Sequence, residues 1–337
     1  MSTQRFTYTY AHERQVAIEA VVKACRLCRA IQSNLTAEHK ISKADTSPVT
    51  VADFGSQALI VSHLLRAFLQ DAIVGEESAT LLRQPEQASL KAHVVNLVNR
   101  IDPHLNETEM LDAIDYGAQT CDFTQRYWTL DPIDGTKGFL RGDQYAVALA
   151  LIEHGEPVVG VLGCPNLLLN PAQPEQGQGC LLTAVKGQGA AIYTLEGTRT
   201  HSISVAPVSE PSQARFCDSV EAAHASHAEH AKIAELLGIT TPSYRIDSQC
   251  KYAIVARGEA SIYLRISPTP NYRSWIWDHA AGTIVVQEAG GKVTDMDGYP
   301  LDFSLGRKLF KNSGVIATNG LLHEIVLGAI RQMIKRR

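Results

Sequence analysis

Two aspartates three residues apart, Asp131 and Asp134, lie in the stretch WTLDPIDGTKGFLRG, residues 128–142. Pro132 fixes one backbone dihedral between them and removes a hydrogen-bond donor, so the turn is stiff. Such a turn can direct both carboxylates and the Ile133 carbonyl to one point. Mg²⁺ is commonly held by one or two carboxylates, with water and phosphate completing its shell. The spacing therefore suits a Mg²⁺ site, although Asp-Pro-x-Asp-Gly is also a common plain turn.

Further acids stand where they could join this pair. Glu76 and Glu77 end a predicted strand, AIVG, and Asp53 lies at the front of a predicted helix. Asp278, in WIWDHAAG, lies at the start of another helix in the C-terminal part. Acids at strand ends and helix starts can converge on one point. Asp53 and Asp278 would equally suit ordinary helix N-caps.

Gly135 and Thr136 follow the aspartate turn directly. They allow the chain to turn tightly, and a helix beginning there would offer free N–H groups to an anion beside the cation site. The combination would place an anion site directly beside a cation site.

Composition limits the possible functions. The chain has 337 residues and is 45% hydrophobic, which is ample for a large core, and its formal charge is −4. We therefore expect no nucleic-acid partner. The longest apolar run, residues 146–152, is too short to span a bilayer, and the seven cysteines are scattered. We expect a soluble cytoplasmic protein that does not associate with a membrane.

Hydrophobic periodicity predicts two halves. Residues 1–200 read as an α+β half: two amphipathic helices, a polar excursion over residues 86–122, and antiparallel strands with a hairpin around His154-Gly155. Residues 201–337 alternate strands with helices and read as an α/β half.

The motifs GEES, WTLDPIDGTKGFLRG and WDHAAGTIVVQEAGGKVTDMDG together resemble the lithium-sensitive, Mg²⁺-dependent phosphatases of the inositol monophosphatase superfamily. Within it, DSQCKYAIVARGEASIYLR, GCPNL and SVEAAHASH resemble the 3′(2′),5′-bisphosphate nucleotidases of fungal and plant type. The resemblance runs from about residue 14 to residue 319. It implies a layered α-β-α-β-α sandwich, with the site between the halves.

The resemblance also implies roles for individual residues. Thr136, with Asp53 behind it, would orient a water nucleophile and accept its proton, so no phosphoenzyme is expected. The metal ligands, for two or three Mg²⁺ ions, would be Glu76, Asp131, the Ile133 carbonyl, Asp134 and Asp278. The substrate contacts would be Gly135, Thr136, His224, Ser248, Lys251 and Arg265.

The resemblance implies an enzyme of sulfur assimilation that hydrolyses adenosine 3′,5′-bisphosphate and also 3′-phosphoadenylyl sulfate. We expect the protein to act as a monomer. Lys251 and Arg265 could neutralise the 5′-phosphate, and a histidine ring could stack on adenine. His224 is preferred over His227 for that contact, and Lys251 taken alone could be an ordinary solvated charge.

Two alternatives remain open at this point. An inositol phosphatase of the same superfamily would share the metal site, but the DSQCKY and YLRIS segments argue against it. A non-catalytic nucleotide or cation sensor would have no need of the complete acidic set.

Overall fold

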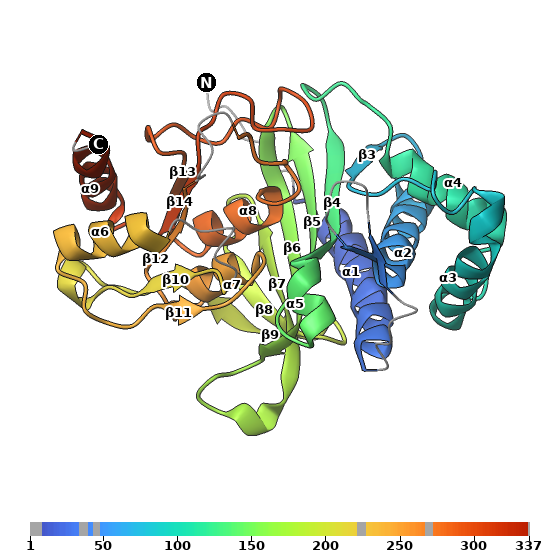
Figure 1. Cartoon of the computed structure of the whole chain (residues 1–337), viewed down its shortest axis with the longest axis horizontal. Helices are drawn as coiled ribbons and strands as arrows, with labels where there is room; N and C mark the ends of the chain where they lie inside the picture. The colour runs from blue at the N-terminus through green and yellow to red at the C-terminus, as the bar shows by residue number, and fades with distance from the viewer. Residues whose placement is uncertain (1–8, 34–39, 43–47, 221–226, 267–271, 336–337) are drawn as a thin grey trace, which may run out of the picture.

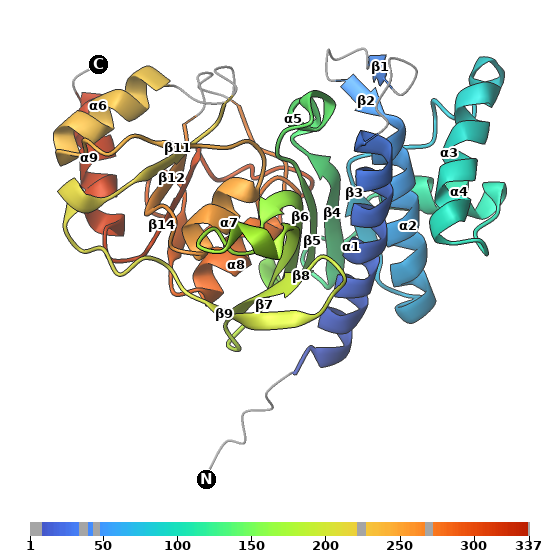
Figure 2. The same ribbon diagram turned by 90° about the horizontal axis from the view of Figure 1, so that it is seen from below.

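The protein folds into five alternating layers of helix and sheet, as the computed structural model in Figure 1 shows. The structure describes residues 9–33, 40–42, 48–220, 227–266 and 272–335. Figure 2 shows the order of the layers from below: an outer helix layer, a seven-stranded sheet, a central helix pair, a five-stranded sheet and a second outer helix pair. The layered α-β-α-β-α sandwich predicted from the sequence is confirmed.

The larger sheet runs β3-β4-β5-β6-β7-β8-β9 in space as in sequence. Its strands are β3 (Ala72–Gly75), β4 (Tyr127–Asp134), β5 (Ala146–Glu153), β6 (Glu156–Leu168), β7 (Gln178–Val185), β8 (Ala190–Thr194) and β9 (Arg199–Ile203). Only the β3–β4 pair is parallel, because a long segment with two α-helices separates those two strands, whereas shorter connections join the others. The hairpin predicted around His154-Gly155 is the β5–β6 turn, where both residues have positive φ.

Strand β5 shows how both faces of this sheet are buried. Val147, Leu149 and Leu151 point to α1 (Ala11–Gln32) and α2 (Val51–Ala67). The alternate positions 146, 148 and 150 are alanines and face the central helices. Alternation of large and small side chains follows the two-residue period of a strand, and the small face lets a helix approach closely. The apolar run over residues 146–152 is therefore a strand covered on both sides.

The central layer consists of α7 (Cys250–Ala256) and α8 (Ala280–Glu288), which pack between the two sheets. All seven residues of α7 are buried, and so are the first seven of α8. A helix that is apolar all round is expected where both sides contact protein. These helices join the two predicted halves into one core, and the division at residue 200 stays a prediction.

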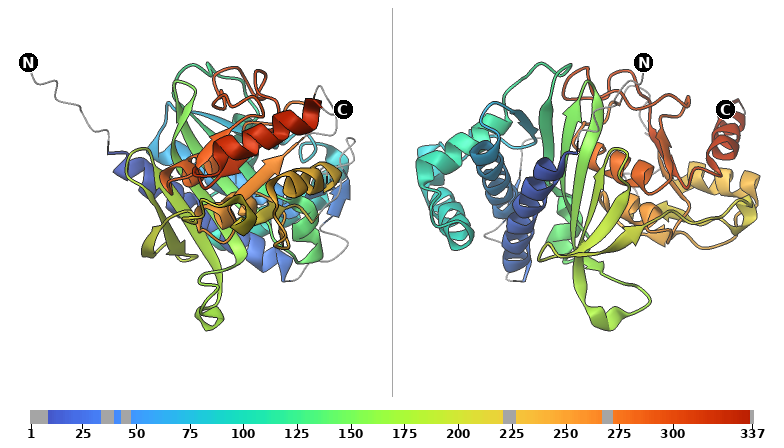
Figure 3. Two further views of the ribbon diagram at one scale, coloured as in Figure 1. Left: turned by 90° about the vertical axis from the view of Figure 1, so that its left-hand side faces the viewer. Right: turned by 180° about the vertical axis from the view of Figure 1, so that it is seen from behind.

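The smaller sheet has the order β11-β10-β12-β14-β13. Its strands are β10 (Phe216–Asp218), β11 (Tyr244–Arg245), β12 (Ile262–Arg265), β13 (Lys292–Thr294) and β14 (Val315–Thr318). Helices α6 (His227–Leu237) and α9 (His323–Lys335) cover its outer face, as the left view of Figure 3 shows. The short pair β1 (Lys40–Ser42) and β2 (Pro48–Thr50) precedes α2.

The prediction of a polar excursion over residues 86–122 was wrong. This region forms α3 (Ala88–Ile101) and α4 (Glu107–Gly117), which pack on α2. Helix α3 fully buries only Val94 and Val98, because it packs on its neighbours with one face. Helix α4 begins with a capping box between Asn106 and Glu109, a signal that was present in the sequence.

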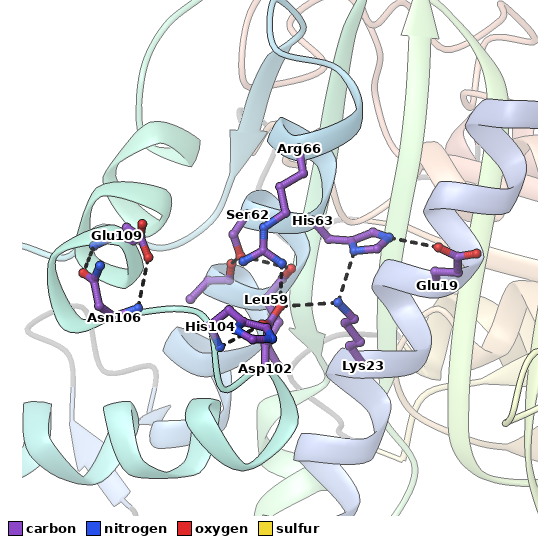
Figure 4. Close-up of polar contacts among 11 residues, drawn as sticks. Glu19, Lys23, Leu59, Ser62, His63, Arg66, Asp102, His104, Asn106 and Glu109 are labelled. Atoms are coloured by element: carbon purple, nitrogen blue, oxygen red, sulfur yellow. Dashed lines mark hydrogen bonds and ion pairs between the residues drawn. The ribbon is translucent and has the colours of Figure 1, made fainter.

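A charge cluster ties α1, α2 and the end of α3 together (Figure 4). Asp102, just after α3, accepts a hydrogen bond from the Arg66 guanidinium at 2.7 Å and lies 3.4 Å from the Lys23 ammonium. The Lys23 ammonium also contacts His63, which in turn lies 3.3 Å from Glu19. The nearby cations hold the pKa of Asp102 below its ordinary value even though burial opposes this. The negative charge is thus compensated on both sides.

No helix in the described part of the chain is long and apolar enough to cross a membrane.

Candidate active site

A cavity of about 300 Å³ lies where β4 ends, beside the start of α7 and the segment before α8. Both sheets contribute to it, so the residues predicted to act together from distant parts of the sequence share one space. The lining residues are Glu76, Asp131, Ile133, Asp134, Gly135, Thr136, Lys137, Gly138, Ser219, Asp247, Ser248, Gln249, Lys251, Tyr263, Arg265, Trp275 and Asp278.

The turn that carries the aspartates is a β-bulge at the end of β4. The pairing with β5 shifts between Asp131 and Asp134, and Pro132 falls in this shift, where it does not have to donate a ladder hydrogen bond. The Ile133 N–H donates to the Asp131 carboxylate at 3.1 Å. The backbone then passes through Gly135 at φ 89°. The bulge directs both carboxylates out of the sheet and into the cavity.

Gly135 is required by its conformation and by its neighbour. A Cβ atom there would lie 2.9 Å from the Cβ of Ser248, which itself adopts φ 64°. Helix α5 (Thr136–Arg141) starts immediately afterwards. Two backbone positions in the left-handed region therefore meet across the cavity, and such positions persist where the surrounding structure fixes them.

The electrostatics of the cavity favour a cation. Asp131 is only 3% exposed, and burial followed by the charges of Glu76 and Asp134 raises its pKa well above the ordinary value. Burial also raises the pKa of Asp278 to about 6, although the Arg265 guanidinium opposes this shift. Like charges held together in a poorly solvated space raise one another's pKa, and a bound cation would relieve the repulsion.

Glu76 follows β3, and α2 fixes the backbone of the next residue, Glu77. The side-chain amide of Gln57 is buried, donates to the carbonyls of Glu77 and Ile114, and accepts from the Glu77 N–H at 3.0 Å. Asp53 lies one turn earlier on the same helix. It is the third helical residue rather than the N-cap considered from the sequence, and its charge contributes to raising the pKa of Asp131.

The donor set suits a hard cation such as Mg²⁺, because it consists of carboxylates and a backbone carbonyl and includes no cysteine or histidine. Within the described residues, no group of three or more acidic, histidine or cysteine side chains is drawn together closely enough to hold an ion as it stands. The assignment of Glu76, Asp131, Ile133, Asp134 and Asp278 as ligands thus remains a prediction, supported by their common cavity.

Gln249 was not identified from the sequence, although it lies within the DSQCKY motif. Its backbone N–H donates to the Asp134 carboxylate. Its buried side chain donates to the Trp277 carbonyl at 2.9 Å and accepts from the Gly282 N–H at 3.0 Å. One residue therefore links the aspartate turn, α7 and the start of α8, next to Asp278.

Lys251 is not the solvated charge that its sequence context allowed. It is 6% exposed and lines the cavity, and its ammonium lies 5.4 Å from the centre of the Tyr263 ring. Among the described residues, no carboxylate lies within ion-pair distance of it. Arg265, in contrast, lies 3.2 Å from Asp278. A buried ammonium that faces a cavity and has no carboxylate in direct contact with it is suited to an anionic ligand.

Thr136 donates to the Ile133 carbonyl at 3.2 Å, so its hydroxyl is held against the aspartate turn. Ser248 accepts the Cys250 N–H at 3.2 Å and lines the cavity as predicted. His224 and the side chain of His227 lie outside the described residues. His230, further along α6, is buried, and its Nδ1 lies 2.6 Å from the Asp218 carboxylate.

A five-layer fold with a carboxylate-lined cavity at the end of β4 defines a class of phosphatases that depend on metal ions. The chain belongs to the inositol monophosphatase family, whose family model matches residues 9–335. This family is generally Mg²⁺-dependent.

Several relatives carry the name 3′(2′),5′-bisphosphate nucleotidase. The relative from Emericella nidulans is 44% identical, with 97% of this chain and 99% of the relative covered. The relative from Oryza sativa is 45% identical, with coverage of 97% and 96%. The resemblance identified from the motifs is confirmed.

Solved structures share the fold at lower identity. An IMPase from Thermotoga maritima superposes with a TM-score of 0.66 at 21% identity, over 96% of this chain and 99% of that one. An inositol monophosphatase from Anabaena superposes with a TM-score of 0.62 at 23% identity, over 95% and 96%.

Proposed function

We propose that the protein is a Mg²⁺-dependent 3′(2′),5′-bisphosphate nucleotidase. It removes the 3′-phosphate of adenosine 3′,5′-bisphosphate to leave AMP, and acts likewise on 3′-phosphoadenylyl sulfate. The observation that carries the proposal is Lys251, a buried ammonium without a carboxylate partner among the described residues, in the same cavity as the acidic turn. The high identity to nucleotidases from a fungus and a plant supports the same substrate class.

The cavity offers two different binding environments to a bisphosphate. The acidic group at the end of β4, with Glu76 and Asp278, would hold two or three Mg²⁺ ions, which neutralise phosphate oxygens and favour departure of the sugar oxygen. Lys251 and Arg265 lie on the α7 and β12 side and would bind the 5′-phosphate through charge-assisted hydrogen bonds.

The chain's own residues would direct water to phosphorus. Thr136 is held at the turn by the Ile133 carbonyl, and its hydroxyl would orient the attacking water. Asp53, buried on α2, would accept the proton. As the water oxygen bonds to phosphorus, the bond from phosphorus to the 3′-oxygen breaks, the 3′-oxygen takes up a proton from solvent, and inorganic phosphate and the nucleoside monophosphate leave.

Lys251→Ala tests the assignment. A lost charge-assisted contact typically costs about 1.5 to 3 kcal/mol, so kcat/KM for adenosine 3′,5′-bisphosphate should fall about ten- to a hundredfold. Hydrolysis of 3′-AMP, which lacks the 5′-phosphate, should hardly change and is the internal control. Phosphate release from both substrates is the measurement.

A general defect in folding or cation binding would depress both substrates alike. Faster release of phosphate from inositol monophosphate than from the bisphosphate by the unmodified protein would replace the proposal by the inositol phosphatase alternative.

A further inference from the structure

Arg307 lies in the segment between β13 and β14, which crosses the end of the larger sheet (Figure 1). Two contacts anchor this segment there. The Tyr127 hydroxyl donates to the Phe303 carbonyl at 2.7 Å, and the Phe303 N–H donates to the Gly155 carbonyl at 3.3 Å. Arg307 is thus carried from the C-terminal part of the chain to the edge where β3 ends.

The Arg307 guanidinium contacts three separate segments. It donates to the carbonyl of Gly75, the last residue of β3, and to the Gln119 carbonyl at 3.4 Å, after α4. Its central carbon lies 4.8 Å from the centre of the Trp277 ring. Gly75 directly precedes Glu76, and Trp277 directly precedes Asp278. One side chain therefore touches the neighbours of two cavity carboxylates, one after the last residue of β3 and the other just before α8.

The form of this side chain suits that position. A guanidinium is planar and rigid, so it can donate in its plane to two carbonyls while its face lies against an indole. No carboxylate in the described part of the chain lies within ion-pair distance of Arg307, so its contacts are to backbone and aromatic groups. Burial lowers its pKa, and the charges of Cys121 and Glu76 oppose that shift.

We propose that Arg307 is a positioning residue that fixes the separation of Glu76 and Asp278 across the cavity and so sets the affinity for Mg²⁺. The inference rests on the proposed function only in taking these two carboxylates as cation ligands. Residues that orient metal ligands typically change metal affinity by 10- to 100-fold when they are replaced.

The direction of the effect separates this role from simple electrostatics. If Arg307 acted only through its charge, removing it would tighten Mg²⁺ binding, because a nearby positive charge repels the ion. If it acts by positioning, Arg307→Met should weaken Mg²⁺ binding about tenfold. Arg307→Lys should also weaken it, because lysine keeps the charge but lacks the planar fork.

The experiment measures Mg²⁺ binding without substrate, by calorimetry and by the rise in Tm over a Mg²⁺ titration that starts from chelated protein. Lys308→Ala is the matched control, because the Lys308 ammonium lies 4.1 Å from the centre of the neighbouring Trp275 ring but makes no bridge to β3. Its Mg²⁺ affinity should stay within twofold of that of the unmodified protein. The Tm in chelator reports whether each variant is folded.

Unchanged or tighter Mg²⁺ binding by folded Arg307→Met would overturn the proposal, as would an equal loss in Lys308→Ala or retention of full affinity by Arg307→Lys. If Arg307→Met does not fold, the lysine variant decides. Protein that binds Mg²⁺ but does not hydrolyse the bisphosphate would contradict the nucleotidase assignment and leave this inference standing. If the unmodified protein binds no Mg²⁺, both the nucleotidase assignment and the role of Arg307 are contradicted.

Discussion

Asp131 and Asp102 are both nearly buried, at 3% and 6% exposure, yet their surroundings move their pKa values in opposite directions. Asp131 faces other carboxylates, and its pKa is raised well above the ordinary value. Asp102 lies between Arg66 and Lys23, and its pKa is lowered (Figure 4). The protein supplies neighbouring positive charges to the carboxylate of Asp102, whereas it surrounds the carboxylate of Asp131 with further negative charges.

The difference separates stability from function. Removing a buried carboxylate that is paired with cations destabilises the fold, whereas clustered carboxylates themselves reduce stability unless a ligand supplies positive charge. Lys251 presents the opposite case, a buried ammonium that lacks a carboxylate partner among the described residues. The cavity thus holds clustered carboxylates and an ammonium that is not in contact with them, and a Mg²⁺-bound nucleotide phosphate would contact both groups.

The largest expected effect is that of Asp131→Asn. Loss of a charge that the cations need should lower kcat/KM for the bisphosphate at least about a thousandfold, since metal assistance supplies several kcal/mol. In chelator the variant should melt no lower than the unmodified protein, because it removes a repelling charge. Steady-state kinetics and thermal melting measure the two effects.

Asp102→Asn is the matched control for that experiment, since it makes the same replacement at a compensated site. Asp102→Asn should have the opposite effects: kcat/KM should be unchanged, and the free energy of unfolding should fall. If both variants lost stability to the same extent, the distinction between the two carboxylates would fail.

Thr136→Ala should have the next largest effect. Removal of a group that positions the proton transfer should lower kcat about a hundredfold with a smaller change in KM. Thr136→Ser keeps the hydroxyl that donates to the Ile133 carbonyl and should retain most of the activity. Equal kcat for the alanine and serine variants would assign the role to another residue.

Local sequence rules predicted the parts of the molecule that depend on local chemistry. The stiff Asp-Pro-Ile-Asp turn, the strand before Glu76 and the His154-Gly155 hairpin could all be predicted from residue type and spacing. Helices α3 and α4 were missed, although the helical spacing of apolar residues in α3 and the capping box of Asn106 in α4 are both present in the sequence. The layer order came from family resemblance, because periodicity does not specify which faces meet.

Contacts between distant segments could not be predicted by those rules. Gln249 links the aspartate turn to the start of α8, and Arg307 reaches the end of β3 across the sheet edge. Neither residue has a sequence neighbour that reveals its partner, because the partner depends on tertiary packing. The burial of Lys251 was missed for the same reason, since lysine is usually exposed.

At the compensated site, Asp102→Asn should reduce the free energy of unfolding by about 1 to 2 kcal/mol. The contacts with Arg66 and Lys23 are charge-assisted, but their partly exposed cations reduce the effect. Denaturant unfolding should show a lower midpoint at neutral pH, with unchanged kcat/KM. A midpoint equal to that of the unmodified protein would mean that the cluster contributes nothing to stability.

The smallest expected effect is the pH dependence of the stability lost in Asp102→Asn. Because the pKa of Asp102 is lower in the folded protein than in the unfolded chain, where it is about 3.9, the unfolded chain binds the proton first as the pH falls. The stabilisation from Asp102 should therefore be complete above about pH 5 and decline below about pH 4. The gap in unfolding free energy between the unmodified protein and Asp102→Asn, measured in chelator at several pH values, should be constant from pH 7 to 5 and narrow below that. A gap that stayed the same down to about pH 3 would show that the amide loses packing or hydrogen bonds rather than charge.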